Sequence, residues 1–244
     1  MKSSRIITSN QLGIHPELEA IVKKHIQQPF QKPISELNLL AFDKANEIYK
    51  KHQHNFILDS GCGVGESTYQ LATKFPDAFV LGVDQSEHRL QSNNQWTLPD
   101  NAFLIQANLI DFWRLAVNSG WNVKRHYLLY PNPWPKKKHL QRRWHGHPIF
   151  PILKELGGTL ELRTNWLIYA EEFKVALSLL LDKELLEKEH LGKKLLGKEF
   201  VDVGFLSKQC QLSAYSPTSA ITPFERKYQL SGQELYQLLI SFAN

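Results

Sequence analysis

The chain has 244 residues, of which 42% are hydrophobic and 22% charged, an ordinary balance for a soluble globular protein. A chain of this length can bury one complete core, so we expect one main domain with smaller additions. The apolar runs are far shorter than the roughly 18 residues of a membrane helix, and no signal-like stretch follows the N-terminus. These features argue against a membrane protein and favour a cytoplasmic one.

The formal net charge is +5, from 29 Lys and Arg against 24 Asp and Glu. One short segment without acids contains as many cations as this excess, namely Lys136, Lys137, Lys138, Arg142 and Arg143. Cations that alternate with aromatic residues are typical of surfaces that bind a phosphate backbone. The charge pattern therefore favours a nucleic acid as partner.

The two cysteines, Cys62 and Cys210, are too few for a disulfide framework. We expect both to be free thiols without a catalytic role. The ten histidines are scattered and form no H-E-x-x-H motif or zinc-type spacing with cysteine. The sequence therefore predicts no metal site.

The first 14 residues show no periodicity and predict a flexible arm that carries Lys2 and Arg5. Helices are expected from Pro16, with Leu18, Ile21, Val22 and Ile26 on one face, and from Pro33, with Leu37, Leu40, Ala41 and Ile48. We expect residues 1–50 to form this arm and these helices, packed on a core domain of residues 51–244.

From Asn55 onward apolar strands alternate with amphipathic helices, which predicts a doubly wound, mostly parallel sheet with helices on both faces. We expect strands near 56–59, 79–84, 102–106, 126–130 and 158–163. We expect helices near 66–75, 87–95, 110–118, 140–155 and 167–181. Residues 182–199 suggest a solvated helix or loop insertion, 201–215 a pair of late strands, and 232–242 a closing helix.

A glycine-rich segment, DSGCGVG at residues 59–65, directly follows the apolar run 56–58. Glycine suits a strand-to-helix turn because the turn needs unusual backbone angles and a ligand must approach the main chain closely. In the dinucleotide fingerprint G-x-G-x-x-G the third glycine would fall at position 66, where Glu66 is badly placed beside a pyrophosphate. The spacing therefore disfavours phosphate as the ligand of this turn.

Asp84 ends the next apolar run, about twenty residues past the turn, where an acid usually binds a ribose diol. Glycines for close approach, an acid in the turn and a ribose acid together suit S-adenosylmethionine, a cationic nucleoside without phosphate. In these residues the chain resembles class I methyltransferases, whose fold is a seven-stranded Rossmann-like sheet. The resemblance implies that the methionine part lies against Asp59, Gly61, Gly63 and Gly65, the ribose against Asp84 and the adenine against Asn108.

A second motif, Pro131-Asn132-Pro133-Trp134-Pro135, follows the fourth predicted strand. Ligands of open α/β sheets lie outside the carboxyl ends of the strands, so this loop should border the same crevice as the glycine-rich turn. The prolines fix the backbone, Asn132 offers a donor and an acceptor, and Trp134 offers a flat face on which a base can stack. The loop therefore predicts a substrate site next to the cofactor.

Segments 59–65, 131–143 and 163–169 together resemble the tRNA (guanine-N7)-methyltransferase family, and Thr222 to Arg226 is similar to its late T-x-[FY]-E-x-R element. The resemblance implies methyl transfer from S-adenosylmethionine to guanine N7 in tRNA, without a general base because N7 carries a free lone pair. It implies three sets of residues. The base would be oriented by Asn132, Thr164 and Tyr169, with Trp134 stacked on it. Phosphates would be bound by Lys136, Lys137, Arg142 and Arg143, with Arg5 as a further candidate. The crevice wall would be shaped by Glu225 and Arg226.

Three positions depart from the family pattern. Asn132 replaces an Asp, Thr164-Asn165-Trp166-Leu167 replaces T-D-x-E, and the adenine-side acid is Asn108. Guanine N1 and N2 are donors, which suit an acceptor-only carboxylate better than an amide, so we interpret the chain as a divergent member.

Two alternatives stay open beside guanine N7 transfer. Asn132-Pro133-Trp134 is also similar to the N-P-P-[YFW] loop of methyltransferases that act on exocyclic amines. The loss of acids is also compatible with a non-catalytic RNA-binding paralogue, although the intact glycine-rich turn argues against it. Monomer and homodimer are both compatible with the sequence.

Overall fold

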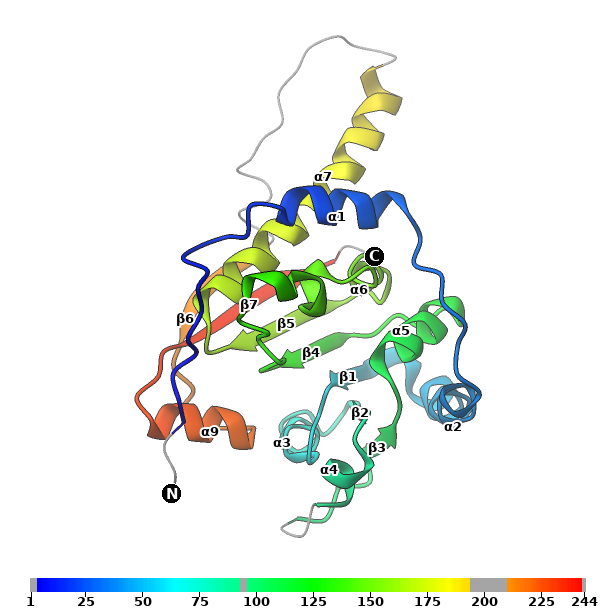
Figure 1. The fold of residues 1–244 in the computed structure, drawn as a ribbon. Coiled ribbons are helices and arrows are strands. Elements are labelled where there is room, and N and C mark those ends of the chain that lie inside the picture. The colour runs from blue at the N-terminus through cyan, green and yellow to red at the C-terminus, as the bar shows by residue number, and fades with distance from the viewer. Residues whose placement is uncertain (1–3, 93–95, 194–209, 243–244) are drawn as a thin grey trace.

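The structure, a computed structural model, describes residues 4–92, 96–193 and 210–242. Within these ranges seven strands form one open sheet in the order β3-β2-β1-β4-β5-β7-β6 (Figure 1). The strands are β1 (Phe56–Ser60), β2 (Phe79–Asp84), β3 (Ala102–Gln106), β4 (Arg125–Leu129), β5 (Thr159–Thr164), β6 (Cys210–Tyr215) and β7 (Leu235–Ser241). β1 to β5 run parallel, and β7 is antiparallel to both of its neighbours. The predicted doubly wound, mostly parallel sheet is confirmed.

Successive residues of the central strands point to opposite faces of the sheet and enter two separate hydrophobic clusters. Leu58, Leu81 and Leu128 belong to the larger cluster, whereas Ile57, Val80 and Tyr127 belong to the smaller one. Because both faces are covered, all residues of β1 and β2 are buried, which explains their continuous apolar sequence.

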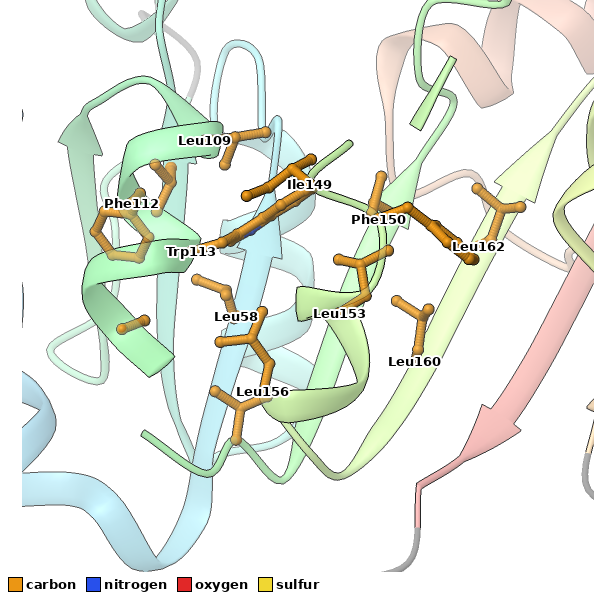
Figure 2. Close-up of a cluster of buried hydrophobic side chains, with 14 of the residues drawn as sticks. Leu58, Leu109, Phe112, Trp113, Ile149, Phe150, Leu153, Leu156, Leu160 and Leu162 are labelled. Atoms are coloured by element: carbon orange, nitrogen blue, oxygen red, sulfur yellow. The ribbon is translucent and has the colours of Figure 1, made fainter. Parts of the chain in front are cut away.

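The larger cluster is covered by α1 (Leu18–Gln27), α2 (Glu36–His52), α5 (Leu109–Asn118), α6 (Ile152–Glu155) and α7 (Leu167–Lys193). Figure 2 shows side chains of α5 and α6, among them Trp113 and Leu153, gathered over β1 and β5. The opposite face carries α3 (Glu66–Lys74) and α9 (Pro223–Leu230), while α4 (Glu87–Gln91) contacts β2 and β3. Three short 3-10 helices complete the described part: η1 (Gln53–Asn55), η2 (Lys137–Arg142) and η3 (Trp144–Gly146).

The N-terminal part differs from the sequence prediction in two ways. The expected flexible arm is wrong for residues 4–14, because Ser4 and Gln11 hydrogen-bond to distant parts of the chain. The expected apolar face of α2 is also partly wrong, since Leu37 is 78% and Leu40 64% exposed. The buried stripe of α2 is instead Phe42, Ala45 and Tyr49. The rings of Phe42 and Tyr49 pack against Trp121.

Two predicted helices are corrected by the structure. Residues 140–155 form η2, η3 and α6 rather than one helix, because Pro148 and Pro151 lack the amide donors of a helix interior. The closing helix at 232–242 is strand β7. Leu235 enters one cluster while Leu238 and Ile240 enter the other, which is the alternation of a strand covered on both faces.

The remaining predicted elements end differently from the expectation. α7 continues through residue 193, so the first part of the expected insertion at 182–199 is helical. Of the segment 201–215, where a pair of late strands was expected, residues 210–215 form β6. Residues 201–209 lie outside the described residues, as do 93–95 at the end of the expected fourth helix. α9 was not predicted; it begins where the Thr222 hydroxyl accepts a hydrogen bond from the backbone N–H of Glu225.

None of the helices in the described ranges combines the length and the apolar character needed to cross a membrane. Among the same residues, no cluster of three or more His, Cys, Asp and Glu side chains gathers in a way that could bind a metal ion. Cys62 and Cys210 are both free, as their number predicted, and both are buried.

Candidate functional site

The glycine-rich turn joins β1 to α3 through three residues with positive φ. Gly61, Gly63 and Gly65 have φ of +79°, +61° and +81°, a region that side-chain-bearing residues rarely adopt. A Cβ at Gly63 would meet no atom within 4 Å, and one at Gly61 would meet only Leu109, at 3.9 Å. A Cβ at Gly65 would instead lie 2.6 Å from the side chain of Leu104, so this position faces packed protein. The backbone at Gly61 and Gly63 therefore faces open space that a ligand can enter.

Asp59, in the last part of β1, is buried directly before this turn. Its Oδ2 accepts hydrogen bonds from the hydroxyls of Ser67 at 2.6 Å and Thr68 at 2.7 Å. Its Oδ1 is buried without a hydrogen-bond partner. Burial raises the pKa of Asp59 to about 6, although the two hydroxyl hydrogen bonds oppose this shift. A buried acceptor without a partner costs about 1 to 3 kcal/mol, so the site is suited to a ligand that brings a donor, above all a cationic one.

Asp84, at the end of β2, fixes the glycine-rich turn. Its Oδ2 accepts from the backbone N–H of Gly63 at 3.0 Å, and its Oδ1 accepts from that of Ser86 at 2.8 Å. Arg89 approaches the same carboxylate at 3.4 Å from the exposed side. Oδ2 already accepts from Gly63 and Arg89, whereas Oδ1 keeps a further lone pair, so binding of a ribose diol by Asp84 stays a prediction.

Asn108 follows β3 and caps α5. Its Oδ1 accepts from the backbone N–H of Ile110 at 2.9 Å, and the backbone N–H of Asn108 donates to Asn38 Oδ1 at 3.0 Å. An amide at this position therefore has a structural reason, because Asn is a favoured N-cap. Its expected place beside an adenine stays a prediction.

The late element Thr222 to Arg226 contacts α3, which follows β1, and also residues near the ends of β4 and β5. Arg226 pairs with Glu66, which is buried at the start of α3. Glu225, fully buried, accepts from the Tyr130 hydroxyl at 2.7 Å and from Arg163 Nη1 at 2.9 Å. Because the Glu66 carboxylate already lies at the helix N-terminus, a phosphate there would meet an acid, as the sequence predicted.

The proline-rich loop leaves β4, the neighbour of β1, so that it and the glycine-rich turn emerge at the same edge of the sheet. Trp134 in the loop and Tyr130 directly before it have positive φ, at 45° and 51°, although neither is a glycine. Asn132 is exposed, and its Oδ1 accepts from the backbone N–H of Trp134 at 3.3 Å. The Arg142 guanidinium lies over the Trp134 ring at 4.8 Å. The loop thus presents an exposed amide, whose oxygen accepts one hydrogen bond, beside an indole of which one face is covered.

Of the remaining residues proposed to orient a base, Tyr169 is corrected. Its side chain is fully buried and its hydroxyl accepts from the backbone N–H of Trp144 at 3.3 Å, so it cannot touch a substrate at the surface. Thr164 ends β5, and its buried hydroxyl accepts from the backbone N–H of Trp166; its role stays a prediction. Asn165, where the family pattern has an acid, donates to Gln233 Oε1 at 2.8 Å.

The basic segment divides into surface cations and one buried cation. Lys136, Lys137, Lys138 and Arg142 are exposed. Arg143 is fully buried and its guanidinium contacts Glu172, so the prediction that it binds a phosphate is wrong. Two adjacent arginines look alike in sequence, and only the packing of α7 against η3 separates their environments.

Residues 53–238 match the model of the family Methyltransf_4, which is described as "Putative methyltransferase". The matched range contains the glycine-rich turn, the proline-rich loop and the late element. The chain belongs to this methyltransferase family.

Curated relatives of this methyltransferase family member include the tRNA (guanine-N(7)-)-methyltransferase of Halorhodospira halophila, 32% identical over 122 residues, which are 47% of this chain and 52% of the relative. The enzyme of the same name from Prochlorococcus marinus is 30% identical over 124 residues, 48% of this chain and 55% of the relative. The chain thus spans about half the length of the curated relatives it matches.

Among solved structures, the 16S rRNA methyltransferase KamB is similar with a TM-score of 0.50 at 13% sequence identity, over 87% of this chain and 96% of that one. At this identity the likeness shows a shared fold. It agrees with the open seven-stranded sheet of this methyltransferase family member.

Sequence analysis missed several residues that build the site of this family member. Ser67 and Thr68 orient Asp59, and a signal existed because two adjacent hydroxyl residues begin the helix after the glycine-rich turn. Glu172, on α7, binds Arg143 and the N-terminal arm. No pattern marked Glu172, because its partners are distant in the sequence.

Proposed function

We propose that this protein is an S-adenosylmethionine-dependent methyltransferase that methylates guanine N7 in tRNA. The names of the curated relatives support the reaction. The structural observation that carries the proposal is the unpaired, buried Oδ1 of Asp59 beside the open backbone of Gly61 and Gly63, at the strand edge where the proline-rich loop also emerges. A tRNA substrate would make the cytoplasm its place of action.

The residues present suit this cofactor. The ammonium group of its methionine part would supply the donor that Asp59 Oδ1 lacks, and its attraction would favour the ionised carboxylate. The glycine-rich turn would let the chain approach closely, and the Glu66 carboxylate disfavours a phosphorylated nucleotide in its place. When bound, S-adenosylmethionine supplies an electrophilic methyl group on a cationic sulfonium.

The chain's own task would be positioning. Guanine N7 is an acceptor with a free lone pair, so no residue has to remove a proton before the methyl is transferred. Asn132 would orient the base through its exposed amide, while Trp134 would offer the ring face opposite Arg142. The exposed cations Lys136, Lys137, Lys138 and Arg142 would bind the RNA backbone. Correct alignment of reacting atoms alone contributes up to roughly 7 to 11 kcal/mol.

The test is incubation of the protein with labelled S-adenosylmethionine and unmodified tRNA transcripts, followed by identification of the methylated nucleoside. The expected product is 7-methylguanosine. Because an acceptor-only group suits guanine N1 and N2 better than an amide, Asn132→Asp should increase the rate on guanine. A product on an exocyclic amine would support the alternative reading of the Asn132 loop and would overturn N7 transfer.

Calorimetry with S-adenosylmethionine separates the enzyme from a non-catalytic RNA-binding paralogue. We expect the wild-type protein to bind the cofactor without RNA. Binding of RNA combined with no heat from the cofactor would remove the enzyme from consideration.

A further inference from the structure

The N-terminal arm, residues 4–14, runs along the same side of the molecule as the proline-rich loop. It starts against the turn after α9, where the backbone N–H of Ser4 donates to Ser231 Oγ at 2.8 Å, and it leads up to α1 (Figure 1). On its way the Ser9 hydroxyl donates to the carbonyl of Pro135 at 2.5 Å, and the backbone N–H of Lys137 donates to Asn10 Oδ1 at 3.4 Å. The arm is thus joined to the start of the basic segment.

A buried carboxylate fixes the end of this arm. Glu172 Oε1 accepts from Gln11 Nε2 at 2.6 Å and from the backbone N–H of His15 at 2.8 Å. Its Oε2 accepts from Arg143 Nη1 at 2.5 Å and lies 2.9 Å from His145 Nε2. We call these five residues the Glu172 cluster. Each of the four side chains Glu172, Arg143, His145 and Gln11 is at most 6% exposed, so the cluster is a buried anchor.

The same cluster also reaches the proline-rich loop. Arg143 donates through Nη2 to Gln11 Oε1 at 3.0 Å and to the carbonyl of Trp134 at 3.2 Å. Trp134 has a positive φ of 45°, which is unfavourable for a residue with a side chain, and this hydrogen bond holds its carbonyl. One guanidinium therefore links the arm and the loop in a single arrangement.

Between the arm and the basic segment lies a groove of about 750 Å³. One wall is Lys136, Lys137 and Lys138, and the other is the arm at Thr8, Ser9 and Asn10. His15, Pro16 and Glu17 also line the groove. The lining contains three exposed lysines and one carboxylate, that of Glu17, so it is cationic and also offers hydroxyl and amide groups. Such a lining fits a phosphodiester, which offers only acceptors on its charged oxygens.

We propose that the N-terminal arm is the second wall of an RNA-backbone groove whose first wall is Lys136 to Lys138, and that the Glu172 cluster anchors this wall. The inference rests on the proposed function for the identity of the nucleic acid. The proposal adds the N-terminal arm to the exposed cations of the basic segment. The arm is more than a hundred residues away in the sequence and lies outside the matched family range 53–238. The groove binds backbone phosphates, and the proline-rich loop next to it receives the base.

The test uses Asn10→Asp, which keeps the Oδ1 acceptor for Lys137 and adds one negative charge inside the groove. The new carboxylate pairs with a lysine across the groove and takes the place of a phosphate. Binding of unmodified tRNA transcripts is measured by equilibrium titration over a range of salt concentrations, without cofactor. We expect weaker binding and a slope of log affinity against log salt that is smaller by about one unit.

Asn118→Asp is the matched control, because Asn118 is exposed at the end of α5, outside the groove. It should bind RNA like the wild type. Gln11→Ala provides a second variant, which removes the side-chain hydrogen bonds of the arm to Glu172 and Arg143 but leaves the Arg143–Glu172 pair and the backbone contact of His15 in place. It should weaken RNA binding while cofactor affinity stays unchanged. Thermal unfolding of each variant verifies that it is folded.

The outcomes separate this inference from the proposed function. If Asn10→Asp and Gln11→Ala bind tRNA with the wild-type affinity and salt slope, the arm is no part of the groove, even when the wild type methylates guanine. If both variants bind more weakly while the wild type transfers no methyl group, the groove stands and the reaction is wrong.

Discussion

Gly63 shows how single residues of the site separate stability from ligand binding. Its φ of +61° strains any residue with a Cβ, yet a Cβ there would meet no protein atom within 4 Å. Gly120, after α5, has φ +71° and is equally free of neighbours. The two glycines therefore impose the same backbone requirement, but only Gly63 lies in the predicted cofactor turn.

We predict that Gly63→Ala and Gly120→Ala each lower the free energy of unfolding by about 1 to 2 kcal/mol. Only Gly63→Ala should also weaken S-adenosylmethionine binding, by at least about tenfold, or roughly 1.4 kcal/mol, because its methyl group would occupy ligand space. Chemical denaturation and calorimetry measure the two effects. Equal cofactor affinity of both variants would place the ligand elsewhere.

Asp59 makes cofactor binding depend on pH. Burial raises its pKa from 3.8 to about 6, so ionisation of this carboxyl destabilises the folded state. The stability that the neutral carboxyl contributes is fully present below pH 3.8 and is lost as the pH rises through 6. A cationic ligand requires the ionised form. Below pH 6 the ligand must therefore displace a proton, and its affinity should fall by about tenfold per pH unit.

We predict that Asp59→Asn binds S-adenosylmethionine weakly and without pH dependence between pH 5 and 7. The unliganded variant should be as stable as the wild type at neutral pH, because it no longer buries an ionised carboxylate. Calorimetry at several pH values and thermal unfolding provide the measurements. A wild-type affinity that is constant across this range would show that Asp59 does not meet the ligand's charge.

At the scale of elements, the Glu172 cluster joins α7, η3 and the arm. Burial pushes the pKa of Glu172 upward, but the hydrogen bonds from His145 and Gln11 and the positive charge of Arg143 outweigh burial and hold it at about 2. Because this pKa is depressed, the stabilisation is present above the unfolded value of 4.5 and is lost as the pH falls toward 2. An ionised carboxylate only accepts, so His145 Nε2 carries the proton in this contact.

We predict that Glu172→Gln lowers the free energy of unfolding by about 3 to 5 kcal/mol, since it leaves the Arg143 charge buried without a counter-ion. Glu171→Gln, one position earlier on the same helix and half-buried, should change it by less than about 0.5 kcal/mol. Denaturant unfolding at neutral pH compares the two. Similar losses in both variants would mean that the cluster does not anchor this part of the fold.

The elements that the sequence predicted well are those whose burial leaves a local signature. β1 and β2 are buried along their whole length, so their apolar runs stand out beside the glycine-rich turn. β7 was misread because Leu235 and Leu238 are spaced like one helix face, whereas they belong to opposite faces of a covered strand. Pairing with β5 and β6 decided its structure, and such pairing is not visible locally.

The same limit explains what was predicted of the site. Asp59 and Asp84 lie at the ends of strands that the pattern located correctly, and the proline-rich loop follows another such strand, so their common edge could be inferred. Tyr169 and Arg143 were assigned to the substrate because the motif contains them, but both side chains face the core. A motif preserves residue types, and only three-dimensional packing decides which of them reach the ligand.

At the scale of the whole molecule, the basic segment presents fewer cations at the surface than it contains in the sequence. Five cations between residues 136 and 143 suggested five phosphate contacts, and thus a salt slope of up to about 4.5. Arg143 is neutralised by Glu172 inside the core, which leaves Lys136, Lys137, Lys138 and Arg142 at the surface. The electrostatic footprint for RNA is therefore one contact smaller than the motif implies.

We predict that log affinity for tRNA falls with log salt at a slope of up to about 3.6 and that Lys137→Ala reduces this slope by about one unit. Lys51→Ala, which removes an exposed lysine of α2, is the control and should keep the wild-type slope because α2 is not part of the basic segment. A wild-type slope near zero would mean that RNA approaches another face. The same conclusion would follow if Lys51→Ala lowered the slope as much as Lys137→Ala does. A slope clearly reduced by Lys137→Ala alone would locate the phosphates at the segment that follows the proline-rich loop, where the base must enter.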